Sequence, residues 1–152
     1  MSVFFDTNLF VYANDLKDQR KRQVAKDRFA DAVRRQEAVV STQVMSEFTD
    51  AAFRKLMLPS QAVLEQITLL ESIEVVQVTP ALIRRGIELH QLYQVRFWDG
   101  CVLAAAEYAG RCRLAPAALV RNGVQHPQMF GMVRHQLAAK LQRILLWCES
   151  QL

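Results

Sequence analysis

The chain has 152 residues, 51% hydrophobic and 22% charged, a length and balance that suit one compact domain with its own core. No apolar run approaches the ~20 residues of a membrane-spanning helix, and residues 3–5 are too short for a signal-peptide core, so we expect a cytoplasmic protein without membrane contact. Three cysteines without C-x-x-C spacing favour neither a disulfide framework nor a zinc site, and a net charge of +4 is compatible with a polyanionic partner without selecting one.

Short apolar runs alternate with longer segments of helical periodicity. The runs 3–5, 38–40 and 73–78 predict strands, because they are apolar and rich in β-branched or aromatic residues. Helices are predicted over 9–13, 21–36, 42–57, 59–70, 80–94 and 98–109. Their starts carry residues that cap or open helices, such as Ser41 and the pair Thr79-Pro80, and Gly110 is placed to end the last one.

This alternation predicts an α/β fold with an open, mostly parallel sheet and helices on both faces. In such sheets the ligand crevice lies beyond the carboxyl ends of the strands. Asp6 follows directly on the first predicted strand, so it is placed at the edge of that crevice.

Two further acids occupy comparable positions. Glu47 lies about a turn and a half into the helix that follows the second strand, and Asp99 lies in the first turn of an apolar helix. Each of the three acids also has a structural interpretation. Asp6 is a possible cap for the helix that begins near Thr7, Asp99 suits the positive end of its own helix, and Glu47 suits a solvated surface.

The segments "FFDTNLFVYA", "VVSTQVMSEF" and "RFWDGCVLAAA" together resemble the first three signature segments of the PIN-domain nucleases, specifically VapC-type toxin ribonucleases. The resemblance covers roughly residues 1–114 and implies a PIN-like three-layer fold with a short central sheet. It places Asp6, Glu47 and Asp99 in the family's acidic, catalytic metal-binding pocket, with Thr7 and Asn8 as supporting neighbours. It also implies metal-dependent hydrolysis of RNA, a homodimer and a cognate antitoxin protein.

Electrostatics supports a cation in such a pocket. Two carboxylates ~4 Å apart repel by roughly 4 kcal/mol at an effective dielectric constant of 20, so converging acids need a compensating charge. An all-oxygen site favours Mg²⁺ or Mn²⁺, which can acidify a bound water for attack on a phosphate. The three histidines form no ligand pair in the sequence and are not needed.

The segment after Gly110 departs from the family pattern. The turn that carries a fourth acid in VapC-type chains reads Arg121-Asn122-Gly123 here, so Asn122 is at most a neutral ligand. Glu107 lies too far along its helix to share a metal, and Asp50 is expected to pair with Arg54. The leading prediction is a VapC-type endoribonuclease. The alternative is a catalytically impaired PIN-fold module that binds RNA or a protein partner.

Three features bear on partners. Phe97 and Trp98 either stack on a base or pack in the core, and the charged helix after Lys17 presents either an RNA-binding or simply a solvated face. Residues 134–152 form a predicted amphipathic helix that packs on its own domain or on a partner. The predicted domains are therefore a PIN-like domain at 1–133 and this C-terminal helix at 134–152.

Overall fold

The computed structural model describes residues 2–110 and 113–115. Its central sheet has four parallel strands in the order β3-β2-β1-β4. The strands are β1 (Val3–Phe5), β2 (Ala38–Ser41), β3 (Glu74–Val76) and β4 (Arg113–Ala115). The helices are α1 (Thr7–Asn14), α2 (Gln19–Arg34), α3 (Thr42–Arg54), α4 (Ser60–Glu71), α5 (Pro80–Tyr93) and α6 (Phe97–Tyr108).

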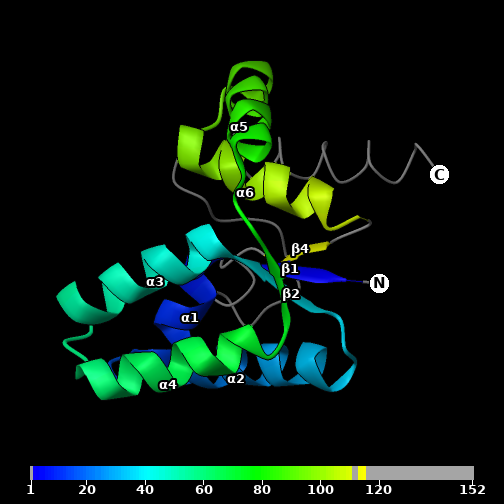
Figure 1. The fold of residues 1–152 in the computed structure, drawn as a ribbon. Helices are drawn as coiled ribbons and strands as arrows, with labels where there is room; N and C mark the ends of the chain where they lie inside the picture. The colour runs from blue at the N-terminus through cyan, green and yellow to red at the C-terminus, as the bar shows by residue number, and fades with distance from the viewer. Residues whose placement is uncertain (1, 111–112, 116–152) are drawn as a thin grey trace.

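The helices form two groups on either side of this sheet. Figure 1 shows α5 and α6 above the strands, α1 and α3 to their left, and α2 and α4 below them. The predicted layered α/β architecture with a parallel sheet is therefore confirmed. Residues 116–152, which include most of the departing segment and the predicted C-terminal helix, lie outside the described residues, so the division at 133 stays a prediction.

The strand order reverses beside β1. The chain runs from β1 outward through β2 to β3, and then returns to place β4 on the other side of β1. A doubly wound sheet opens a crevice at such a switch point, beyond the carboxyl ends of its strands. We therefore expect the crevice between the helices that follow β1 and β2 on one face and α6 on the other.

The core beneath this crevice is aromatic. The rings of Phe5, Phe10, Phe29 and Phe48 pack edge to face with centroids 5.3–6.5 Å apart. They come from β1, α1, α2 and α3, and Phe5, Phe10 and Phe48 are buried. Such aromatic pairs stabilise the fold by more than the burial of their surface alone. They therefore hold β1 and α1, which flank Asp6, in a fixed position relative to α3, which carries Glu47.

The predicted helix caps agree with the structure better than the predicted helix ends do. Ser41 and Thr79 accept hydrogen bonds from the backbone N–H groups of Val44 and Leu82 and so cap α3 and α5. Gly110 has φ +66°, as expected for a residue that ends a helix. In contrast, α3 ends at Arg54 and not at the predicted Met57, which adopts a left-handed φ of 53°.

The outer strands are short. β3 covers Glu74–Val76 instead of the predicted 73–78. β4 pairs with β1 at the edge of the sheet and adds a strand to the three that the sequence predicts.

Candidate functional site at the carboxyl ends of the strands

Asp6 connects β1 to α1 at the switch point. Its Oδ1 accepts a hydrogen bond from the backbone N–H of Leu9 at 3.3 Å, so it is the N-cap of α1. Its other oxygen accepts from the side-chain amide of Asn8 at 3.4 Å. The predicted capping role is thus confirmed, and the Asn8 amide contacts the same carboxylate.

Burial raises the pKa of Asp6 above its ordinary value. The hydrogen bonds from Asn8 and Leu9 oppose this shift, and the negative charge of Asp99 adds to it. The charged form of Asp6 is therefore destabilised by its surroundings, and a nearby cation would relieve that cost.

Asp99 approaches the same crevice from the opposite face, in the first turn of α6. Burial raises the pKa of Asp99, the neighbouring charge of Arg96 lowers it, and the charge of Glu47 raises it again. Asp99 thus interacts electrostatically with both other acids.

Glu47 is the most firmly held of the three acids. Its Oε2 accepts a hydrogen bond from the Thr7 hydroxyl and its Oε1 accepts one from the Gln43 amide, both at 2.8 Å. The hydrogen bond from Thr7 therefore joins the start of α1 to Glu47 on α3.

Gln43 was not predicted as a site residue. Its buried side-chain amide also donates to the backbone carbonyl of Trp98 at 3.3 Å, so it links Glu47 on α3 to the start of α6, next to Asp99. Only its i, i+4 spacing from Glu47 was a clue in the sequence, and that spacing is common on helices.

The three acids do not form a closed ligand cluster. In the described part of the chain, no three His, Cys, Asp or Glu side chains stand close enough together to hold a metal ion. None of the three acids forms a salt bridge with a described lysine or arginine either. Oxygen donors, burial and the lack of a salt-bridge partner among the described residues fit a hard divalent cation.

Other candidate ligands are engaged elsewhere. Asp50 forms the expected ion pair with Arg54. Both oxygens of Glu107 bond to the Arg85 guanidinium, at 2.8 and 3.1 Å. His90 bonds to the carbonyl of Val95 between α5 and α6. The predicted neutral ligand Asn122 lies outside the described residues.

Trp98 does not pack in the core. Its side chain is 62% exposed, next to Asp99, and its ring lies 5.2 Å from that of Phe97. Of the two interpretations made from the sequence, burial is therefore wrong for Trp98, and base stacking stays open.

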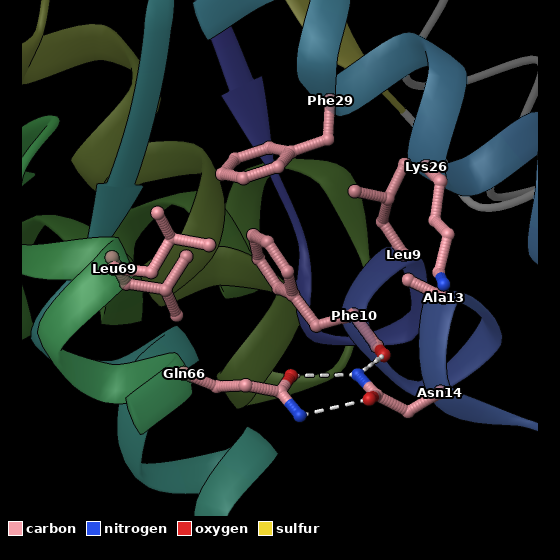
Figure 2. Close-up of a pocket in the computed structure, with 9 residues that line it drawn as sticks. Leu9, Phe10, Ala13, Asn14, Lys26, Phe29, Gln66 and Leu69 are labelled. Atoms are coloured by element: carbon pink, nitrogen blue, oxygen red, sulfur yellow. Dashed lines mark hydrogen bonds between the residues drawn. The ribbon is translucent and has the colours of Figure 1, made fainter. Parts of the chain in front are cut away.

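A separate hollow of about 290 Å³ lies between α1, α2 and α4 (Figure 2). Asn14 and Gln66 close one side of it through two reciprocal amide hydrogen bonds of 2.7 and 2.8 Å. Its lining is mostly apolar, and Lys26 is the one charged residue among those that line it. It lacks the carboxylates on which phosphate chemistry depends, so we do not assign the reaction to it.

The fold and the site define an α/β domain with acids gathered around the switch point of a parallel sheet. The PIN domain family model matches residues 3–112, and the chain belongs to the PIN domain family. The structure resembles that of the VapC20 toxin from Mycobacterium tuberculosis, described as cleaving the sarcin-ricin loop. The TM-score is 0.58 at 21% identity, over 72% of this chain and 84% of that one. A comparison with curated proteins finds no match.

The resemblance to PIN domains that the sequence predicted is thus confirmed. Within the described residues, no helix is both long and apolar enough to cross a membrane.

Proposed function

We propose that the chain is a divalent-metal-dependent endoribonuclease of the VapC toxin type. Membership of the PIN domain family and the structural likeness to a VapC toxin support this activity. The observation that carries the proposal is a pair of acids, Asp6 between β1 and α1 and Asp99 in the first turn of α6, whose pKa values burial raises. Each also interacts with another carboxylate, and neither has a cationic salt-bridge partner among the described residues.

In this proposal Asp6, Glu47 and Asp99 hold Mg²⁺ or Mn²⁺. When bound, such a cation supplies charge neutralisation at the phosphate and a water of lowered pKa. Asn8 keeps Asp6 oriented, and Thr7 and Gln43 fix Glu47. The exposed Trp98 is positioned to stack on a base beside the phosphate that is cleaved.

The proposal extends to partners and place of action. By analogy with the VapC toxin, we propose an RNA substrate, a cognate antitoxin that covers the acidic crevice, and a homodimer acting in the cytoplasm. In this proposal the predicted helix at 134–152 packs on its own domain or on a partner, and Asn122 is at most a neutral metal ligand.

The test is RNA cleavage by the purified full chain with Mn²⁺. A sarcin-ricin loop oligoribonucleotide is the first substrate to try, because the VapC20 toxin cleaves that loop. We expect cleavage that a chelator stops and Mn²⁺ restores. We expect Asp99→Asn to be at least about a hundredfold slower, since loss of even an outer-shell partner of a metal costs about 10–100-fold.

The matched control is Asp31→Asn, which removes the same charge from an exposed site on α2. It should cleave like the wild-type chain. Equal cleavage by the wild type and Asp99→Asn would point to a contaminating nuclease and contradict the proposal.

The second candidate is a PIN-fold module that binds RNA or a protein partner without turnover. The open arrangement of the three acids and the missing fourth carboxylate favour it. RNA binding by the wild-type chain without cleavage in Mg²⁺ or Mn²⁺ would select this function.

Gln43 gives a further prediction about the same site. Gln43→Met keeps the size of the side chain but removes the donor to Glu47 and to the Trp98 carbonyl. Because residues that orient metal ligands typically contribute about 10–100-fold, we expect Mn²⁺ affinity to fall by about tenfold. Calorimetric titration with Mn²⁺ measures this directly, without relying on cleavage.

The control for Gln43 is Gln61→Met. Gln61 donates to Glu65 in the same i, i+4 geometry on α4, but at an exposed site. Its loss should leave Mn²⁺ affinity unchanged. Equal Mn²⁺ affinity in Gln43→Met and the wild type would remove Gln43 from the site.

A further inference from the structure

A second hollow begins at the acidic site and runs along α3. It measures about 250 Å³ and is lined by Thr7, Asn8, Val11, Glu47, Asp50, Ala51, Arg54 and Lys55. Its residues on α3 recur at intervals of three or four, so they form one stripe along the helix. The hollow therefore connects the Thr7 and Glu47 pair to the C-terminal end of α3.

Charge changes sign along this hollow. Glu47 lies at one end. Arg54, the last residue of α3, and Lys55, its C-cap, lie seven and eight residues further along the chain, which at ~1.5 Å per residue is roughly 10–12 Å. A single phosphate bound near Glu47 does not span that distance. The basic end is thus suited to a different phosphate of the same strand.

We propose that this hollow is a subsite for RNA, in which Lys55 and Arg54 bind a backbone phosphate neighbouring the one that is cleaved. The inference rests on the proposed nuclease function, since it assigns the path of that substrate away from the acidic centre. The RNA in the subsite is single-stranded, because a hollow of this size admits one backbone and not a duplex.

Both basic side chains are free to make this contact. Lys55 forms no salt bridge with any described residue. Arg54 pairs with Asp50, but both side chains are exposed, at 73% and 54%, and exposed i, i+4 pairs are weak. A phosphate, which accepts two parallel hydrogen bonds from a guanidinium, competes well with such a partner.

The backbone does not supply the contact. The C-terminal end of a helix carries partial negative charge, so the end of α3 by itself disfavours an anion. Binding there depends on the two side chains, and their removal should abolish it. Asp50 works against the anion as well, and its neutralisation should strengthen binding.

The test measures binding of a fluorescein-labelled single-stranded oligoribonucleotide by anisotropy, from about 50 to about 200 mM KCl. The Asp99→Asn chain serves as the background, so that cleavage does not interfere. Each phosphate contact contributes ~0.7 to the slope of log affinity against log salt for single strands. We expect Arg54→Ala with Lys55→Ala to weaken binding and lower that slope by about 0.7–1.4.

The control is Arg34→Ala with Arg35→Ala, which removes two exposed arginines at the end of α2. It should leave the slope unchanged. Asp50→Asn should tighten RNA binding, in contrast to the Arg54 and Lys55 double variant, because it removes a negative charge and releases Arg54. In the cleaving chain, Lys55→Ala should raise KM and leave kcat unchanged.

An unchanged slope in the Arg54 and Lys55 double variant, or an equal loss in the α2 control, overturns the subsite. Such a result leaves the nuclease function standing if the wild type cleaves RNA. Conversely, a lowered slope in a chain that binds but never cleaves supports the subsite and contradicts the nuclease. Absence of RNA binding by the wild type overturns both.

Discussion

Asp6→Asn is expected to slow metal-dependent RNA cleavage by more than about a hundredfold and to make the folded chain more stable. Loss of a direct ligand should cost at least as much as loss of an outer-shell partner, about 10–100-fold. Stability should rise because burial raises the pKa of Asp6, which means that its ionised form is disfavoured in the folded protein. Asparagine is neutral and caps helices as well as aspartate, so α1 keeps its N-cap.

The sign of the pH dependence follows from the same shift. A carboxyl group whose pKa is higher in the folded than in the unfolded state makes its stabilising contribution at low pH. That contribution is lost as the pH rises from the ordinary value of 3.8 through the raised pKa. The wild type should lose stability over this interval relative to Asp6→Asn, and Mn²⁺ should bind less tightly as the pH falls through it.

Thermal unfolding with and without Mn²⁺ measures both effects. Mn²⁺ should raise the Tm of the wild type and leave that of Asp6→Asn nearly unchanged. Asp6→Ala is the contrasting variant, because it removes the charge and also the cap, at a cost of about 0.5–2 kcal/mol. A Mn²⁺ response of Asp6→Asn equal to that of the wild type would exclude Asp6 as a ligand.

The inner strands could be predicted because their sequences leave little choice. Val3 to Phe5 is a continuous apolar run that ends at a carboxylate, and β1 has those same bounds. The end of α3 was wrong because Met57 continues the apolar pattern of the helix, yet its side chain is 79% exposed. An apolar residue does not by itself show whether its side chain is buried, so the apolar pattern predicted a helix end beyond the observed one.

The sequence predicts three acids at one edge of the sheet, but it does not predict how their side chains are held. Asp6 follows β1, Glu47 lies about a turn and a half into α3, and Asp99 lies in the first turn of α6, so the topology predicts all three at the same end of the sheet. The role of Gln43 depends on the Trp98 carbonyl, 55 residues away in the chain. A contact of that kind arises from packing between helices, which local patterns do not encode.

The crossing of α5 and α6, which positions Asp99, could not be predicted from local sequence patterns either. The two helices meet at Gly86 and Gly100 with their backbones in close approach. A Cβ atom at Gly100 would lie 2.4 Å from the carbonyl oxygen of Gly86, a distance that only movement of a helix can relieve. Glycine at 100 is therefore required by the neighbouring backbone, immediately beside a proposed metal ligand.

Gly100→Ala is therefore expected to reduce both stability and activity. Alanine gains up to about 1 kcal/mol from helix propensity, but overpacking against a rigid backbone typically costs about 1–3 kcal/mol or more. We expect a net loss of about 2 kcal/mol, or about 4–8 °C in Tm for a chain of this size. Because α6 must shift, Asp99 shifts with it, and a displacement of about 1 Å at a catalytic group can cost about a hundredfold in rate.

Two companion variants separate backbone contact from side-chain contact. A Cβ atom at Gly86 meets the Cys101 Sγ first, at 2.7 Å, so Cys101→Ala should partly rescue Gly86→Ala. It should not rescue Gly100→Ala, whose nearest contact is a backbone oxygen. Tyr108→Ala, at a 74% exposed position on α6, should leave Tm and cleavage near wild type. If Gly100→Ala keeps full activity and an unchanged Tm, the close approach of the two helices does not hold Asp99 in place.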